Sequence, residues 1–350
     1  MRTMLTFWIT FSAPLLAWAA ALAGAGWLAR PTARWRLLDH PNARSLHQHP
    51  IPRTGGWAVL GGLVIGGAGL ALCLPDIRPL LIPLPGGLLP LVMVSWFDDR
   101  RGVAARWRLI VHVGAATSLI LAGFTLPPFP PGLSEPLPFW AVTGLTGLFI
   151  LWMINLYNFM DGMDGFAGGM AVIGFTTLAW LGRADAGFAA VSLTIAAASA
   201  GFLAYNFPPA RLFLGDTGST ALGFLAAACS LWGSASGLFP FWAALWVFSP
   251  FIVDATVTLL RRLMRGERVW EAHRSHYYQR LVLLGWGHRR TVLAEYVLML
   301  ACAGAAMLTV QLPPNGAFML AIGGVCVYGL LIGSIGWLEQ RSAQRSQRGC

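Results

Sequence analysis

The chain has 350 residues, of which 56% are hydrophobic and only 11% are charged. Soluble globular proteins carry about 25% charged residues, so this composition excludes an ordinary soluble domain. The formal net charge is +10, and all 24 residues of the Lys-plus-Arg class are arginines. The five cysteines are scattered without a Cys-x-x-Cys pair, which argues against a disulfide framework or a structural zinc site.

Apolar runs recur along the whole sequence, and each is long enough to cross ~30 Å of hydrocarbon as a helix. They predict a single all-α polytopic membrane domain over residues 1–350, with about eleven transmembrane helices. In chain order the predicted spans are 4–29, 55–74, 79–97, 108–126, 138–157, 165–182, 187–206, 217–233, 238–261, 291–311 and 316–337. The first run is longer than a signal-peptide core and has no clear cleavage site, so it is predicted to be a retained span.

The arginines predict the orientation of the bundle. Of the 24 arginines, 21 lie on one set of connections, and only Arg2, Arg78 and Arg183 lie on the other. The positive-inside rule therefore predicts an external N-terminus and a cytoplasmic C-terminus. The predicted cytoplasmic loops are approximately 30–54, 98–107, 158–164, 207–216 and 262–290.

Acidic residues gather at the predicted cytoplasmic ends of three segments far apart in the sequence. Asp98 and Asp99 close the third span. A polar run from Asn155 to Asp164 joins the fifth span to the sixth, and Asp216 opens the eighth. Because an unpaired ionisable group at membrane depth costs several kcal/mol, such residues are functional candidates by default.

The spacing of these residues indicates what they bind. Asn155, Asn158 and Asp161 are three residues apart, so on a helix they form one stripe, and Asp164 continues the interval. Such oxygen ligands suit a hard cation such as Mg²⁺. Asp216 lies in a Gly-Asp-Thr-Gly-Ser turn at a helix start, where a carboxylate and exposed backbone N–H groups suit a phosphate together with its metal. Helix capping is the ordinary alternative for any one of these residues.

Two predicted cytoplasmic loops supply positive charge opposite the acids. Arginine forks and imidazoles are natural ligands of a diphosphate. The substrate-binding candidates are Arg44, His47 and Arg53 in the first loop and His273, Arg274 and His276 in the last.

Three other polar residues are interpreted as structural. His112 and His288 are isolated histidines, which are more often structural than catalytic. Asp254 lies within the ninth span, close to Pro250. It is expected to hold the Arg261–Arg262 end of that helix or a neighbouring helix.

Taken together, these motifs resemble those of the polyprenyl-phosphate N-acetylhexosaminyl-1-phosphate transferases. That family includes phospho-N-acetylmuramoyl-pentapeptide transferase and the enzymes that initiate O-antigen synthesis. The resemblance covers nearly the whole chain, and its most specific part is Asn155-x-x-Asn158-x-x-Asp161-Gly-x-Asp164-Gly.

The resemblance implies roles for individual residues. Asp216 would be a ligand of Mg²⁺, or of Mn²⁺ in its place. Asp98 and Asp99 would lie near the attacking lipid phosphate, with Asp98 a candidate base or nucleophile. Asn158 and Asp161 would lie in the nucleotide-diphosphate site. The catalytic candidates are Asp98, Asp99, Asp161 and Asp164; the substrate-binding candidates also include Asn155, Asn158, His273, Arg274 and His276.

The reaction implied is transfer of a sugar 1-phosphate from a UDP-N-acetylsugar to undecaprenyl phosphate, with release of UMP. The resemblance also implies that this reaction occurs at the cytoplasmic face of the inner (plasma) membrane of a bacterium. The last loop lacks the run of consecutive histidines of the peptidoglycan enzyme, and the chain has no lysine. Both features favour the O-antigen-initiating branch, and the peptidoglycan transferase is the alternative. The expected partners are the two substrates, membrane lipids and, in a homodimer, a second copy of the chain, with no nucleic acid.

Two rival functions fit the sequence less well. An ion-coupled transporter would place its acids near the bilayer midplane and show a repeat between halves. Here the acids cluster at one face and no clear repeat is visible. A phosphotransferase acting on a CDP-alcohol would need Asp-Gly followed by Ala-Arg on one helix, which the segment around Asp161 does not provide.

Overall fold

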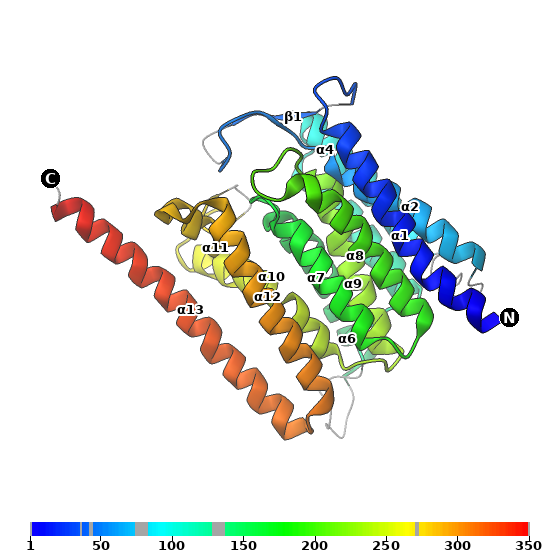
Figure 1. Cartoon of the computed structure of the whole chain (residues 1–350). Helices are drawn as coiled ribbons and strands as arrows, with labels where there is room; N and C mark the ends of the chain where they lie inside the picture. Colours follow the sequence, from blue (N-terminus) through cyan, green and yellow to red (C-terminus); the bar gives the residue numbers. More distant parts are fainter. Residues whose placement is uncertain are drawn as a thin grey trace.

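The computed structural model describes residues 2–35, 37–41, 45–73, 83–127, 137–269 and 273–348 of the chain, and it is a helical bundle with one very short strand pair (Figure 1). The first half contains α1 (Arg2–Leu28), β1 (Leu38–Asp39), β2 (Ile51–Pro52), α2 (Gly55–Cys73), α4 (Pro83–Arg101), α5 (Ala105–Leu121) and α6 (Phe139–Phe159). The second half contains α7 (Phe166–Leu181), α8 (Ala186–Asn206), α9 (Gly215–Ala235), α10 (Phe241–Met264), α11 (Tyr277–Leu281), the π-helical turn η2 (Val282–Trp286), α12 (Gly287–Gln311) and α13 (Pro314–Arg348).

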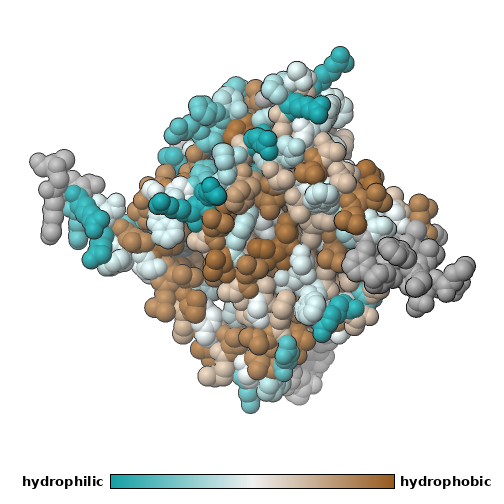
Figure 2. All heavy atoms as spheres, in the orientation of Figure 1, coloured by the Kyte–Doolittle hydropathy of each residue, from teal (hydrophilic) through white to brown (hydrophobic). Residues whose placement is uncertain are grey.

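Each of the eleven predicted apolar runs corresponds to a long helix in the part of the chain that is described. Within the described ranges, six helical segments are long and apolar enough to cross a membrane, and two shorter apolar helices accompany them. The chain is therefore an all-α, multi-pass membrane protein, whereas the exact number of spans and the orientation stay predictions. Figure 2 shows a hydrophobic band across the middle of the bundle, with hydrophilic residues gathered mainly along the edge where β1, α11 and the C-terminus lie.

Several helix ends differ from their predicted positions, and two of these ends carry candidate site residues. The prediction ended the third span at residue 97, but α4 continues to Arg101, which places Asp98 and Asp99 in its last turn. The two arginines in that turn interact favourably with the negative C-terminal end of the helix dipole, which stabilises the additional turn. Similarly, α9 begins at Gly215 instead of 217, so Asp216 lies in its first turn.

Helix α9 is the centre of the bundle. Every residue from Thr217 to Ser234 is buried, and α9 packs against α4, α6 and α2. Small residues allow this close approach, as is usual between membrane helices. A Cβ atom on Gly223 would lie 2.5 Å from the Met153 carbonyl oxygen of α6. This central position fixes the start of α9, and with it Asp216, relative to the ends of α4 and α6.

The loop before α2 is tied to the loop before α9. β1 and β2 pair antiparallel, and the Phe213 N–H donates to the Pro52 carbonyl oxygen over 2.7 Å. The Gly55 and Gly56 N–H groups donate in turn to the Phe213 and Leu214 carbonyl oxygens, each over 2.8 Å. Two loops that are about 160 residues apart in sequence thus form one surface beside Asp216.

Candidate active site

Two polar cavities lie at the end of the bundle where α4 and α6 end and α9 begins. The first has a volume of about 370 Å³ and the second about 490 Å³. They have four lining residues in common, Asp161, Gly162, Asp216 and Gln279. A molecule in one cavity would therefore meet a molecule in the other at Asp161 and Asp216.

The first cavity is lined mainly by the connecting loops, and it brings together several of the predicted site residues. His47 and Arg53 of the first predicted cytoplasmic loop both line it. The His47 Nε2 atom lies 3.6 Å from an Asp39 carboxylate oxygen, and its ring packs edge-on against Phe213 at 5.0 Å. Arg44, which the sequence analysis grouped with them, lies outside the described residues. The other lining residues of interest are Asp99, Asp164, Asn206, Gly215 and His288.

The second cavity is lined by helices α4, α5 and α6 and by the connection from α10 to α11. It contains Asp98, Arg108, His112, Asn155, Asn158, His273 and His276. Two apolar residues at its rim, Leu109 and Phe159, are 55% and 42% exposed. This cavity therefore borders the apolar outer surface of the bundle, whereas the first cavity opens among polar loops.

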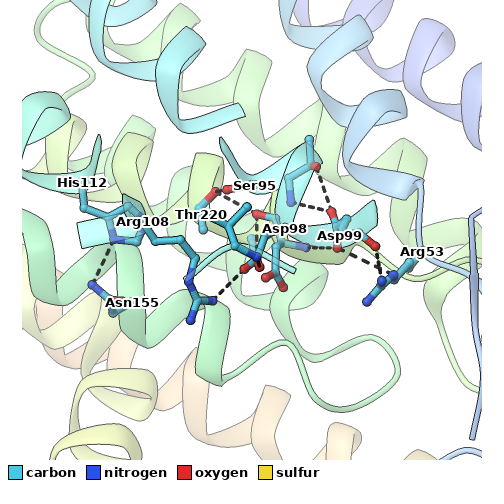
Figure 3. A network of polar contacts seen from close by, with 12 residues as sticks. Arg53, Ser95, Asp98, Asp99, Arg108, His112, Asn155 and Thr220 are labelled. Atoms are coloured by element: carbon cyan, nitrogen blue, oxygen red, sulfur yellow. Dashed lines mark hydrogen bonds and ion pairs between the residues drawn. The ribbon is translucent and has the colours of Figure 1, made fainter. Parts of the chain in front are cut away.

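Asp98 and Asp99 are adjacent in sequence but line different cavities, and Figure 3 shows the separate polar contacts of the two side chains. Successive side chains on an α-helix are rotated by about 100°. The resemblance placed both residues near the lipid phosphate, and the structure does not bring them to one cavity.

Asp99 caps the N-terminus of α9. Its carboxylate is 2% exposed and accepts hydrogen bonds from the Asp216 N–H, the Thr217 N–H and the Thr217 hydroxyl, over 3.2, 3.2 and 2.9 Å. The Arg53 Nε atom lies 3.8 Å from it, and an Arg53 Nη group donates to the Asp99 carbonyl oxygen (Figure 3). Three donors at the helix N-terminus and an arginine hold the Asp99 carboxylate in place, which indicates a positioning role.

Asp98 is held at the edge of the second cavity. One carboxylate oxygen accepts a hydrogen bond from the Val103 N–H over 2.6 Å, and the other pairs with Arg108 Nη1 at 2.7 Å. Asp98 and Asp216 both line the second cavity, close enough for their carboxylates to repel each other. Asp98 is thus fixed in orientation, with Asp216 beside it.

Position 215 must be glycine because three segments of the chain come close together there. Its φ of +74° is a conformation that other residues rarely adopt. A Cβ atom here would lie 2.5 Å from the Arg53 carbonyl oxygen and 3.2 Å from an Asp99 carboxylate oxygen. The Gly-Asp of the Gly-Asp-x-Gly-Ser motif therefore allows α9, α4 and the Arg53 loop to meet around Asp216.

Asp161 lies in the short loop after α6, where it faces both cavities. Burial raises the pKa of Asp161 well above its usual value, and the nearby carboxylates of Asp216 and Asp99 raise it further. Carboxylates crowded in this way need either protons or a cation to balance their charge.

The residues present fit a magnesium ion that uses few protein ligands. Among the described residues, no group of three or more His, Cys, Asp or Glu side chains is arranged to hold a metal. Mg²⁺ usually keeps several waters and binds one or two carboxylates together with substrate phosphates. Asp216, with Asp98 and Asp161 beside it, meets that requirement.

Asp164 lies in the wall of the first cavity. One carboxylate oxygen lies 2.9 Å from His288 Nδ1, and the other accepts a hydrogen bond from the Ala210 N–H over 3.0 Å. The next residue, Gly165, donates its N–H to Asn206 over 2.9 Å. These contacts join the α6–α7 loop to the α8–α9 loop and to the start of α12.

The polar stripe predicted from the Asn/Asp spacing is divided between the two cavities. Asn155 and Asn158 line the second cavity, Asp161 faces both, and Asp164 lines the first. The stripe turns because α6 ends at Phe159 and the chain leaves the helix between Asn158 and Asp164.

The site candidates of the last predicted loop line two different cavities. His273 and His276 line the second cavity, whereas Arg274 lines a separate cavity on the other side of the segment. Burial lowers the pKa of His273 to about 4, and the neighbouring His276 and Arg262 contribute to the shift. His273 is therefore neutral near pH 7, and its Nδ1 lies 2.8 Å from the Ser275 hydroxyl.

Asp254 holds a neighbouring helix, which is one of the two structural roles expected for it. Instead of holding the Arg261–Arg262 end of α10, its carboxylate accepts hydrogen bonds from the Tyr277 and Tyr278 N–H groups over 3.0 and 3.1 Å. It also lies 3.1 Å from His276 Nδ1. Asp254 thus anchors the segment that carries the histidines.

Replacing Asp254 with alanine should release the His273–His276 segment. Each buried N–H left without a partner costs about 1–3 kcal/mol, so we expect a lower unfolding temperature and at least about a tenfold loss of turnover. Asp254→Asn, which keeps one acceptor, should lie between Asp254→Ala and the wild type. Thermal unfolding in detergent and turnover assays would measure both effects. Wild-type stability and turnover in Asp254→Ala would contradict the anchoring role.

Several polar residues at the cavities were not among the predicted site residues, and one of them is Arg108, which pairs with Asp98. Gln279 lines both cavities, Asn206 and His288 line the first, and His112 lies in the second, where Asn155 Nδ2 is 3.3 Å from its Nδ1. Gln279 follows His276 by three residues, and this helical spacing was a usable signal. Nothing in the sequence distinguished His112 and His288 from structural histidines.

The fold and the site thus define a multi-pass membrane protein with a paired, charge-rich cavity at one end. A sequence model of glycosyl transferase family 4 matches residues 81–234. A probable undecaprenyl-phosphate N-acetylglucosaminyl 1-phosphate transferase of Bacillus subtilis is 31% identical over 267 residues, covering 75% of this chain and 74% of the relative. This chain belongs to glycosyl transferase family 4.

Two further relatives represent different branches. A decaprenyl-phosphate N-acetylglucosaminephosphotransferase of Mycobacterium tuberculosis is 27% identical over 337 residues, covering 85% of this chain and 82% of the relative. A phospho-N-acetylmuramoyl-pentapeptide-transferase of Picosynechococcus is 30% identical over 271 residues, covering 71% of this chain and 73% of the relative. The family resemblance seen in the sequence is confirmed.

Proposed function

We propose that this protein transfers an N-acetylhexosamine 1-phosphate from a UDP-sugar to undecaprenyl phosphate and releases UMP. The observation that carries the proposal is the pair of polar cavities that meet at Asp161 and Asp216. A reaction that transfers a phosphoryl group from one anionic substrate to another needs two binding sites that meet where the transfer occurs. The names of the relatives from Bacillus and Mycobacterium, which both specify a polyprenyl phosphate and N-acetylglucosamine, support this chemistry.

The surroundings of the cavities favour one arrangement of the substrates. The second cavity borders exposed apolar residues such as Leu109, which suits a phosphate on a long lipid tail. The first cavity lies among polar loops and has an aromatic ring, Phe213, at its wall, which suits a nucleotide. The diphosphate would then lie at the junction, with Arg53 on one side and Arg108 on the other to balance its charge.

The overall chemistry is the transfer of one phosphoryl group. A lipid phosphate oxygen forms a bond to the sugar-linked phosphorus, and the bond from that phosphorus to UMP breaks. Asp98 is oriented by Arg108 and the Val103 N–H and can act in one of two ways. It either takes the proton from the lipid phosphate as a general base, or it attacks the sugar-linked phosphorus first and is then displaced from it by the lipid phosphate. When bound at Asp216, Mg²⁺ would neutralise the charge of the diphosphate. Asp99 keeps α9 and Asp216 in place.

An assay of sealed membrane vesicles tests both the reaction and the side of the membrane on which it occurs. UDP-N-acetylglucosamine and other UDP-N-acetylsugars would be added to inside-out and right-side-out vesicles that contain the protein, undecaprenyl phosphate and Mg²⁺. We expect UMP release from inside-out vesicles only, because the arginine distribution predicts a cytoplasmic site.

The choice of UDP-sugar separates the branches. Turnover with a UDP-N-acetylhexosamine supports the proposal, and turnover only with UDP-N-acetylmuramoyl-pentapeptide would support the peptidoglycan branch. Vesicles without added lipid phosphate are the control. No UMP from any donor would contradict the proposal.

A further inference from the structure

A third cavity, of about 360 Å³, lies where α10, α11 and α13 meet, and the proposed reaction does not use it. Arg261, Arg262 and Arg265 come from the end of α10, Arg274 and Arg280 from the next connection and from α11, and Glu339 from α13. The polar residues Thr258, Ser275 and Tyr277 complete its wall together with Leu283. No other cavity described above has more than two arginines in its lining.

Among the described residues, the acidic side chains at this arginine cavity balance only part of its positive charge. Arg280 forms a bidentate ion pair with Glu339, with N–O distances of 2.7 and 2.5 Å. Glu267 lies 2.8 Å from Arg262 and 3.8 Å from Arg265. Five arginines therefore face two carboxylates among the described residues, which leaves three positive charges. A phosphate group that accepts hydrogen bonds from arginine forks would balance this excess.

The arginine cavity also lies at the end of a membrane-spanning helix. Arg261 and Arg262 occupy the last turn of α10, whose apolar segment is Phe241–Met264. Leu263 and Met264, beside them, are 52% and 87% exposed, and Leu283 in the cavity wall is 56% exposed. Arginines beside exposed apolar side chains at a helix end are typical of the membrane–water interface, where basic residues attract anionic lipids.

We propose that the arginine cavity binds a phosphate group, and its position at the end of α10 favours the headgroup of an anionic phospholipid over free phosphate. The arginine cavity and the second active-site cavity lie on opposite sides of the segment 273–280. His273, His276, Tyr278 and Gln279 face the second cavity, while Arg274, Ser275, Tyr277 and Arg280 face the arginine cavity. A bound headgroup would therefore restrain the outer side of the segment that presents the two histidines.

Native mass spectrometry of the full-length, delipidated protein in neutral detergent tests the proposal. We expect phosphatidylglycerol to bind at least about tenfold more tightly than phosphatidylcholine. The double substitution Arg261→Gln and Arg265→Gln should weaken phosphatidylglycerol binding by about 25-fold, at about fivefold for each arginine. The matched control is Arg289→Gln with Arg290→Gln, which changes two exposed arginines at the start of α12 outside the cavity. This control should keep wild-type binding.

Two further arms identify the source of the phosphate and guard against misfolding. Millimolar inorganic phosphate that displaces the lipid would show that the phosphate group alone suffices, and failure to displace it would show that the lipid is the ligand. A photoactivatable phosphatidylglycerol bound to the wild type should label peptides within residues 261–283. Equal binding of the two lipids, equal losses in both double variants, or labelling elsewhere would overturn the proposal. Because the readout is binding, the result does not depend on transferase activity.

Discussion

Replacing Asp216 with asparagine should lower turnover by about a thousandfold and leave the fold intact. Asp216 lies at the junction of the two cavities, with Asp98 and Asp161 beside it. A divalent cation stabilises the transferring phosphoryl group by several kcal/mol, and 1.36 kcal/mol corresponds to a tenfold change in rate. The amide keeps the size of the side chain but removes its charge, so cation binding should suffer and packing should not.

Turnover and cation binding would be measured together. Purified wild type should lose activity in EDTA and regain it with Mg²⁺ or Mn²⁺. Electron paramagnetic resonance of added Mn²⁺ should show a bound ion in the wild type and little in Asp216→Asn. The matched control is Asp185→Asn, since Asp185 also lies at the start of a helix, where it caps α8. An Asp216→Asn variant with wild-type turnover would exclude the assignment of Asp216 to a metal.

The positions of the long helices were predictable because a membrane-spanning helix must be both long and apolar. The helix ends were less predictable, as α4 shows. Its last turn contains Asp98, Asp99 and two arginines, so hydropathy ends the span too early, although the backbone continues as a helix to Arg101. The short helix α11 was placed within a loop, because five residues give too little periodicity to detect.

Several of the candidate site residues lie at the same two cavities, but the partners of each side chain could not be predicted. Spacing along a helix placed Asn155, Asn158 and Asp161 together, and the structure agrees that they share the second cavity. Which way two neighbouring residues point depends on the packing of the helix that carries them. Sequence alone could not tell that His273 and Arg274 face different cavities, or that Asp254 reaches across to the backbone of α11.

Asp98 and Asp99 offer a direct test of how packing divides two identical side chains. Asp98→Asn should lower turnover by about 10²–10⁴-fold, which is the range expected when a general base or nucleophile is removed. Its unfolding temperature should change little, because Asp98 lies at a cavity edge and an asparagine can still accept the hydrogen bond from the Val103 N–H.

Asp99→Asn should show the opposite pattern, since Asp99 is buried and its charge faces Arg53 and the first N–H groups of α9. The amide replaces one acceptor oxygen with an NH₂ group that faces the N–H donors of α9. Each buried donor left without a partner costs about 1–3 kcal/mol, so the unfolding temperature should fall clearly. Turnover should fall as well, but only to the extent that α9 and Asp216 shift. Unfolding in detergent, together with kcat and KM for the UDP-sugar, would separate the two variants. If both showed equal stability and equal turnover, the division of roles between a reacting Asp98 and a positioning Asp99 would be wrong, because only different environments can give identical side chains different roles.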